Sequence, residues 1–479
     1  MTGFRLAMIA VCLMLATAAS AKDKEGNCSD NLDCKSSWVS LETAQRKQVF
    51  TFGEGYKKFL ELARTELSFV THAVALAEKN GFRRFKENEP VQPGEKYYVV
   101  NRDRTLALIV IGNQPMAQGF RVVGAHIDSP RLELKARPLY EKEGFALFQT
   151  AVHGGIKPYQ WTNIPLALSG RVDRKNGSTL MVDVGMADDD PIFVIADMSP
   201  HTDRGYADKK VKDQVTHEEL DPIVGHIPGT SGKDVAEEVM NYLAQEYNLS
   251  RADLVSAELA LTPAYKSRDV GFDRALIAAY GQDDRLGGYA GLMAALGLDS
   301  PERTAVVYLV DNEEVGNVNN TGAKSDFFTT MLARLLRSAA EGGYNDLMLR
   351  DALAASEMIS IDVNPGVNPK NPGGFEISNA PRLGHGVNLK MYGHGFNANS
   401  EFTAKIRGLL DAAGIAWQTA SYKEGGGRGG TIGGEFTRLN MEVIDFGVPV
   451  LSIHTPYSIS SKVDVYNLYR ASAEFLQQP

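Results

Sequence analysis

The chain is poor in cysteine, and its few cysteines all lie near the start. Cys12, Cys28 and Cys34 are the only three among 479 residues. No thiol is therefore available as a nucleophile or a metal ligand in the rest of the sequence. This scarcity argues strongly against cysteine–histidine catalysis and against the cysteine-rich zinc sites that stabilise small domains.

An excess of positive charge is also lacking. The 50 lysines and arginines are outnumbered by 59 aspartates and glutamates, which gives a net charge of -9. Because nucleic-acid-binding proteins present a basic surface, we expect no nucleic-acid partner. The imbalance is too small to indicate disorder, and 43% hydrophobic residues suffice for a large core. The length predicts one long domain or two.

Long apolar runs are missing except at the N-terminus. Arg5 precedes an apolar stretch at residues 6–18, and the small residues 19–21 follow it. A basic start, a short apolar stretch and a small-x-small site are typical of a secretory signal, and the stretch is short for a membrane span. We therefore expect a signal peptide at residues 1–21 and an exported protein, periplasmic or secreted, without membrane attachment after cleavage. An uncleaved anchor is the alternative.

A polar segment at residues 22–37 follows the predicted signal and is expected to be flexible. It contains Cys28 and Cys34. In an exported protein these two cysteines can close a small disulfide loop, and two free thiols are the alternative.

Two adjacent glutamates stand at the end of an apolar run. Residues 304–310 predict a buried strand, and the sequence Asp-Asn-Glu-Glu-Val-Gly follows at 311–316. Carboxylates rarely adjoin a core unless they are paired or bind a metal. Because adjacent residues point in different directions, one of Glu313 and Glu314 can hold a metal while the other handles a proton. A solvated strand end is the alternative.

Four more segments carry potential ligands where a strand ends or a helix begins. They are His126 and Asp128 after the strand 121–125, the pair Asp283–Asp284 before a helical pattern, Asp362 after the strand 358–361, and His454 at the end of the strand 444–454. The carboxyl ends of parallel strands converge on one crevice. A mixed set of nitrogen and oxygen ligands suits zinc, cobalt or manganese.

The periodicity divides the chain into three parts. Residues 38–136 begin with a helical pattern at 52–80 and continue with strands. Residues 137–265 are rich in turns and short strands, and residues 266–479 alternate strands with helices. This alternation predicts an α/β fold with a mainly parallel sheet flanked by helices. Because the ligand candidates lie in the first and third parts, we expect one catalytic domain interrupted by the second part.

Together these motifs resemble the aspartyl aminopeptidase family of dinuclear zinc metallopeptidases. The resemblance rests on residues 124–130, 283–286, 311–316 and 430–433, on Asp362 and on His454. It covers most of the mature chain. It implies a phosphorylase/hydrolase-like catalytic domain with an inserted β-rich dimerisation domain. It also implies that the dimers, as homo-oligomers, assemble into a dodecamer.

The resemblance implies that two divalent metal ions are held per subunit, with Zn²⁺ expected and Co²⁺ or Mn²⁺ as alternatives. The implied ligands are His126, Asp283, Glu314, Asp362 and His454. Asp283 would bridge the two ions, and it is preferred over Asp284 because the bridging residue of the family precedes an Asp or Asn.

The resemblance also assigns catalytic roles. Glu313 would be the general base and Asp128 would orient His126. The family places a histidine of the inserted domain in the neighbouring subunit's active site, where it stabilises the oxyanion. His201 is the candidate for this role, and His153 is the second choice; for each of them, a surface histidine without such a role is the alternative.

Substrate selection is open at this stage. Lys390 stands where a lysine that recognises acidic side chains is plausible, and a solvated lysine at a strand edge is the alternative. Gly430, Thr431, Ile432 and Gly433 are expected in a substrate-pocket loop. The segment after Asp362 lacks a histidine that the family often has, which leaves specificity in doubt.

The predicted function is that of an exported aminopeptidase that acts on peptide substrates. It would release N-terminal residues, with Asp or Glu as candidates, by means of a metal-activated bridging water. One alternative is a dinuclear hydrolase of another amide bond. The other is a scaffold without activity that kept the fold, although a scaffold has no use for the general base Glu313.

Overall fold

The computed structural model describes residues 35–479 apart from 231, 233, 341–342, 393–396, 422 and 424–429. The predicted signal at residues 1–21 and the two possible states of Cys28 and Cys34 lie outside the described residues. Among the described helices, none is both long enough and apolar enough to cross a membrane.

A nine-stranded sheet forms the centre of the molecule. In spatial order its strands are β1 (Arg83–Arg84), β2 (Lys96–Asn101), β3 (Thr105–Val110), β13 (Ala305–Val310), β4 (Arg121–His126), β14 (Glu357–Ile361), β18 (Glu442–Gly447), β16 (Val387–Lys390) and β17 (Trp417–Thr419). The four central strands β13, β4, β14 and β18 are mutually parallel. The expected α/β fold with a mainly parallel sheet is confirmed.

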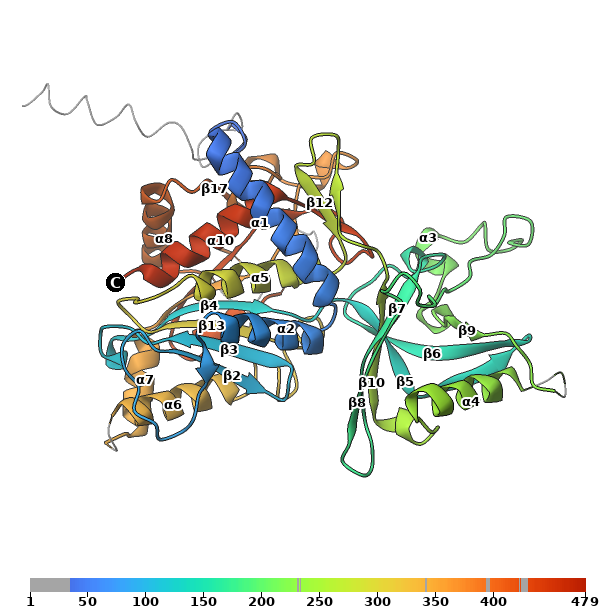
Figure 1. The fold of residues 1–479 in the computed structure, drawn as a ribbon. Helices are drawn as coiled ribbons and strands as arrows, with labels where there is room; N and C mark the ends of the chain where they lie inside the picture. The colour runs from blue at the N-terminus through green and yellow to red at the C-terminus, as the bar shows by residue number, and fades with distance from the viewer. Residues whose placement is uncertain are drawn as a thin grey trace, which may run out of the picture.

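Helices cover both faces of this sheet (Figure 1). One face packs against α1 (Thr43–Leu62), α2 (Glu66–Lys79), α5 (Gln282–Leu296), α8 (Ser400–Ala412) and α10 (Lys462–Gln477). The other face packs against α6 (Phe327–Ala339), α7 (Asp346–Ala354) and α9 (Gly433–Thr437). Side chains of β13 alternate between these two layers: Val307 and Leu309 face the first, and Val306 and Tyr308 the second. Burial on both faces explains why its sequence is an unbroken apolar run.

Strand register brings the ligand candidates to one edge. His126, the last residue of β4, pairs with Val310, the last residue of β13. On the other side of β4, Ser360 pairs with Gly124, so that Asp362 emerges near His126. Because the three strands are parallel, their carboxyl ends meet at the same edge, as expected.

A second sheet lies beside the first, at the right of Figure 1. Its six strands, in spatial order, are β8 (Thr179–Val184), β7 (Leu166–Asp173), β10 (Ala257–Pro263), β5 (Arg131–Lys142), β6 (Phe145–His153) and β9 (Ile223–Gly225). Its strand pairs are antiparallel, and α4 (Val235–Tyr247) packs on β5 and β6. The short helix α3 (Val211–Gln214) lies in the loop before β9. The sheet has a hydrophobic cluster of its own, which contains Leu132, Phe148 and Trp161.

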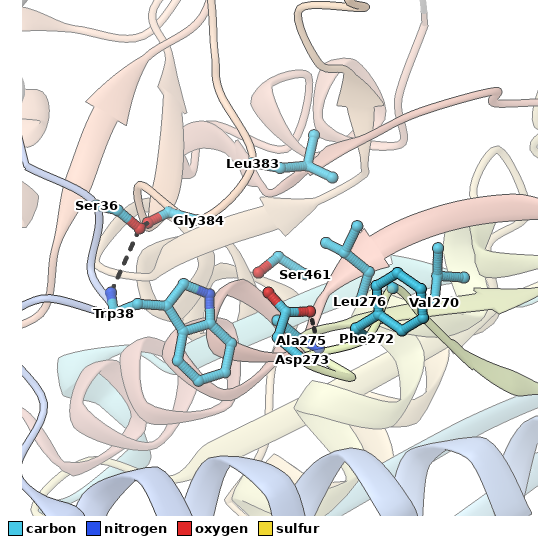
Figure 2. A pocket seen from close by; sticks show the side chains of 11 residues that line it. Ser36, Trp38, Val270, Phe272, Asp273, Ala275, Leu276, Leu383, Gly384 and Ser461 are labelled. Carbon is cyan, nitrogen blue, oxygen red and sulfur yellow. Dashed lines mark hydrogen bonds between the residues drawn. The ribbon is translucent and has the colours of Figure 1, made fainter.

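Two small sheets complete the fold. They are β11 (Arg268–Val270), β12 (Leu276–Ala279) and β20 (Ser458–Ser461) in one, and β15 (Asn364–Pro365) with β19 (Pro449–Val450) in the other. The hairpin of β11 and β12 borders a hollow of about 550 Å³, which Trp38, Phe272 and Leu383 help to line (Figure 2). None of the candidate site residues lines this hollow.

Two expected elements differ from those observed. The helical pattern at 52–80 forms two helices, because Thr65 is extended and its hydroxyl accepts a hydrogen bond from the N–H of Ser68, which starts α2. The strand expected at 444–454 ends at Gly447 and resumes only as the two-residue β19. Pro449 cannot donate a hydrogen bond to a neighbouring strand, and His454 lies in a loop at φ 60°.

Candidate metal centre

Five of the predicted side chains meet at the edge where β4, β13 and β14 end. β4 supplies His126, and the segments after β13 and β14 supply Glu314 and Asp362. Asp283 stands at the start of α5 with non-helical backbone angles, and its peptide bond to Asp284 is cis. The loop between β19 and β20 supplies His454.

Asp283 lies between the two histidines. Its Oδ1 is 3.2 Å from Nε2 of His126, and its Oδ2 is 3.0 Å from Nε2 of His454. Each carboxylate oxygen therefore faces a different imidazole. Such an arrangement suits a carboxylate shared between two cations.

A further acid stands beside each histidine. Nε2 of His126 is 3.9 Å from Oδ1 of Asp362, and Nε2 of His454 is 3.3 Å from Oε1 of Glu314. Among the described residues, two groups bring potential ligand atoms within 4.8 Å of one another: His126–Asp283–Glu314 and His126–Asp284–Asp362. The second group contains Asp284, which is fully buried and was expected to be only the neighbour of the bridging residue.

The acids of the cluster repel one another. Burial and the charges of Asp362, Asp283 and Asp128 raise the pKa of Glu313 to about 7, although His126 opposes this shift. Burial, together with the charge of Asp283, also raises the pKa of Glu314 and that of Asp362. Ionising several neighbouring carboxylates together is costly, because their negative charges repel one another. A divalent cation bound between them offsets this repulsion.

Two buried oxygens support the fit of a cation. Oε1 of Glu314 and Oδ2 of Asp284 accept no hydrogen bond within the described part of the chain. Buried polar atoms are nearly always bonded, so each of these oxygens calls for a partner. Carboxylates and imidazoles match the ligands of catalytic zinc. The residues present therefore fit the divalent metal that the sequence predicted.

Asp128 lies behind His126 and is fully buried. Its Oδ1 is 3.2 Å from Nδ1 of His126 and accepts the N–H of Glu313 at 3.1 Å. Its Oδ2 accepts the N–H of Glu314 at 3.2 Å. Burial opposes its ionisation, but hydrogen bonds from His126 and His153 hold the pKa of Asp128 well below its usual range. The same carboxylate thus holds a ring and the backbone of the glutamate pair.

Lys390, Gly430 and Thr431 adjoin the cluster, each through a different neighbour. Nζ of the buried Lys390 donates to the carbonyl oxygen of Asp362 at 3.4 Å. A Cβ on Gly430 would be 3.4 Å from Oε1 of Glu313, so the glycine adjoins the predicted base. Thr431 bonds the hydroxyl of Ser360 at 2.8 Å.

The other two members of the segment 430–433 point elsewhere. Ile432 is fully buried in the cluster between the sheet and helices α6, α7 and α9. Gly433 is the first residue of α9. Both residues are buried, and their predicted contact with substrate stays a prediction.

His201 is not brought to the cluster within one chain. It is exposed in the loop after β8, and no contact described in this chain joins its ring to the cluster. Its N–H donates to the hydroxyl of Ser199 at 3.2 Å. The predicted role of His201 in a neighbouring subunit stays a prediction.

Glu133 was not expected at the centre, and His153 was expected only as the second choice for a histidine that enters a neighbouring subunit's site. Nε2 of His153, at the end of β6, is 2.8 Å from Oδ2 of Asp128. Its Nδ1 is 3.3 Å from Oε1 of Glu133. The signal that could have placed His153 in the centre of its own chain is its position at a strand end before Gly154 and Gly155, as for His126 at the end of its strand.

Known proteins resemble this chain over nearly its whole length. A relative from Clostridium acetobutylicum named probable M18 family aminopeptidase 1 is 39% identical over 456 residues, which cover 92% of this chain and 98% of the relative. The crystal structure of an M18 family aminopeptidase from Thermotoga maritima matches with a TM-score of 0.87 at 34% identity, and covers 93% of this chain and 99% of that chain. The structure of the S. cerevisiae mApe1 dodecamer has the same fold, with a TM-score of 0.72 at 21% identity over 88% of this chain and 96% of that chain.

These comparisons contradict the expectation of an exported protein, periplasmic or secreted. The relatives from Clostridium, Borrelia and Thermotoga are named as family aminopeptidases, and nothing in their names indicates export. The pattern at residues 1–21, on which the expectation rested, lies outside the described residues and gains no support.

The sequence also matches a whole family. Residues 59–476 match the family described as aminopeptidase I zinc metalloprotease (M18). The matched span contains every predicted metal ligand and the glutamate pair. This chain therefore belongs to the M18 family of zinc aminopeptidases.

Proposed function

We propose that the chain releases N-terminal residues from peptides with two divalent metal ions held by one cluster. His126 and Asp362 would hold one ion, Glu314 and His454 the other, and Asp283 would bind both. The observation that carries this proposal is the position of Asp283, whose two oxygens face His126 at 3.2 Å and His454 at 3.0 Å.

Zinc bound there would polarise the scissile carbonyl and lower the pKa of a water molecule. The chain's own residues supply the proton transfer. Glu313 is partly exposed beside the ligands, so it can accept a proton from the attacking water and pass that proton to the leaving amine. Asp128 fixes the backbone N–H of Glu313, which keeps the base in place relative to His126.

The acidic cluster also suits the substrate's N-terminus. A free α-amino group donates hydrogen bonds, and the carboxylates of Asp283, Asp362 and Glu314 provide acceptor oxygens around the site. We expect a blocked N-terminus to abolish binding of this kind. This requirement separates an aminopeptidase from a hydrolase of other amide bonds.

Preference for N-terminal Asp or Glu is the finer part of the proposal, and Lys390 would carry it. Its side chain is buried and contacts the backbone of Asp362, and its charge favours the ionised forms of Asp362 and of the buried Asp445. A substrate carboxylate that reached Lys390 would be paired with it away from water, where such a pair is strong.

Assembly of several copies is also proposed. The second sheet, from the part predicted at residues 137–265, would form dimers, and the dimers would assemble into a dodecamer. The likeness to the mApe1 dodecamer supports this proposal. The exposed His201 would then enter the site of a neighbouring subunit.

The test is hydrolysis of a panel of aminoacyl p-nitroanilides by the purified chain. It is run with added zinc or cobalt, with a chelator, and with Glu313→Gln. We expect hydrolysis that requires a free amine, that the chelator removes, and that falls by at least about 100-fold in Glu313→Gln while bound zinc is retained. Activity that survives the chelator or Glu313→Gln would contradict the proposal.

A further inference from the structure

His153 comes from the second sheet but lies against the metal centre of the first. It is the last residue of β6 and is 5% exposed. Gly154 follows it and leaves room for Glu314, since a Cβ there would be 2.9 Å from Oε2 of that residue. Gly155 approaches His454, because a Cβ there would be 3.5 Å from its Nδ1. The end of β6 is thus built around the predicted ligands.

Both nitrogens of the His153 ring are occupied by carboxylates. Nε2 is 2.8 Å from Oδ2 of Asp128, and Nδ1 is 3.3 Å from Oε1 of Glu133. An ionised carboxylate only accepts hydrogen bonds, so both ring nitrogens donate. Neither nitrogen is left for a substrate oxygen, which argues against the role in oxyanion stabilisation that the sequence left open for His153.

Asp128 receives four donors, and His153 is the one from the second sheet. The other three are Nδ1 of His126 and the backbone N–H groups of Glu313 and Glu314. The Oδ2 that His153 contacts also accepts the N–H of Glu314. A carboxylate held by donors on both oxygens has one orientation, and that orientation fixes the ring of a metal-binding histidine.

The partners of His153 are themselves anchored. Oε1 of Glu133 is 2.8 Å from Nη2 of Arg131, and Nη1 of Arg131 is 3.1 Å from Oε2 of Glu66. Glu66 lies in α2, so this chain of charges joins the second sheet to a helix that covers the first. The position of His153 is therefore set by both sheets.

We infer that His153 is a positioning residue for the metal centre, which acts through Asp128 to hold His126 and the Glu313–Glu314 backbone in their binding geometry. This inference rests on the proposed metal ligands. It links the second sheet to the chemistry of the first, so that displacement of β6 would loosen the zinc site.

The experiment compares zinc affinity and kinetics of full-length variants. His153→Phe keeps a ring but removes both donors, and His153→Gln keeps one donor group. His226→Phe is the matched control, because His226 is exposed on the same sheet and stacks on Phe145. Each protein is stripped of metal, its zinc affinity is measured by competition with a chromogenic chelator, and kcat and KM are then measured on a leucyl substrate.

We expect His153→Phe to weaken zinc binding by about tenfold and to lower kcat, with KM changed less than about twofold. His153→Gln should lie between His153→Phe and wild type, and His226→Phe should match wild type. If His153→Phe binds zinc and turns over as wild type does, whatever its melting temperature, the inference is overturned. An equal loss in His226→Phe, or a rise in KM alone, would overturn it too.

Glu133→Gln provides a second route if His153→Phe does not fold. It leaves His153 in place but weakens the bond to its Nδ1, so a smaller loss of zinc affinity in the same direction is expected, and unchanged affinity overturns the inference. Zinc affinity is measured without turnover. A wild-type protein that binds zinc but cleaves no aminoacyl substrate would therefore contradict the proposed function and leave the test of His153 intact.

Discussion

Oδ2 of Asp283 lies 3.0 Å from Nε2 of His454, while its Oδ1 is directed away from that histidine toward His126 at 3.2 Å. His126 ends a strand of the main sheet, and His454 lies in a loop more than 300 residues later. Asp283 is thus the side chain that joins the two halves of the proposed site.

Removal of this shared carboxylate should affect both metal positions. We expect Asp283→Ala to bind neither zinc ion at micromolar zinc, whereas His454→Ala should keep about one ion per chain. Zinc content after dialysis, measured by atomic emission, distinguishes these outcomes. If Asp283→Ala keeps one ion and His454→Ala loses both, the shared ligand has been assigned wrongly.

Zinc binding should release protons. Burial opposes a charge on His454, but its hydrogen bond to Asp283 and the charges of Asp283 and Glu314 raise the pKa of the metal-free ring to about 9. The ring is therefore protonated at pH 7.5 and must lose its proton to bind zinc. Apparent zinc affinity should rise with pH up to about 9, by about tenfold per unit for each proton released.

Calorimetry in buffers with different ionisation enthalpies measures this release directly. We expect at least one proton per chain at pH 7.5 and fewer in His454→Ala. If zinc affinity does not change with pH between 6 and 8, His454 does not lose a proton when zinc binds, and this prediction is wrong.

Lys390 should decide the preference for acidic N-terminal residues. We expect Lys390→Met to lower kcat/KM for aspartyl and glutamyl substrates by about 100-fold, because a charge-assisted contact worth about 3 kcal/mol is lost. Hydrolysis of a leucyl substrate should change little. Parallel kinetics on the three substrates give the answer. A uniform loss on all three would instead mean that Lys390 supports Asp362, whose carbonyl oxygen it contacts.

A buried charge cluster away from the site should contribute to stability. Asp269 in β11 is 2.8 Å from Nζ of the fully buried Lys462 in α10 and 2.6 Å from Nζ of Lys57 in α1. Asp269→Asn leaves these two cations with only the half-exposed Glu54 as a shared anion, at 2.9 Å from Nζ of Lys57 and 3.1 Å from Nζ of Lys462. We expect it to lower the free energy of unfolding by about 2 kcal/mol, a loss between those of exposed and of buried pairs.

Urea unfolding measures this loss, with Arg274→Gln as the control. Arg274 also contacts Asp269, at 2.6 Å, but its side chain is 70% exposed, so its removal should cost less than about 1 kcal/mol. Equal losses in the two variants would show that burial of Lys462 does not determine the strength of the cluster.

The sequence predicted those side chains of the site that directly follow an apolar strand. His126, Glu314 and Asp362 follow unbroken apolar runs, and the parallel pairing of those strands brings their ends together. The α/β architecture follows from the same runs, because strands buried on both faces need helices on each side. The positions of these side chains required only periodicity and strand order, whereas the choice of Glu314 over Glu313 as the ligand came from the family resemblance.

Other parts depend on contacts that no local pattern encodes. His454 was expected at a strand end, but it lies in a loop after a two-residue strand, so its position depends on long-range packing. His153 meets Asp128 across two different sheets. The break of the first helical pattern depends on one cap, Thr65, within a continuous amphipathic sequence.

The most direct test of the shared carboxylate is a crystal structure of the zinc-loaded protein with anomalous diffraction recorded at the zinc edge. The proposal predicts two anomalous peaks per chain, one beside His126 and Asp362 and one beside His454 and Glu314, with Asp283 between them. A single peak, or two peaks that do not share Asp283, would contradict it.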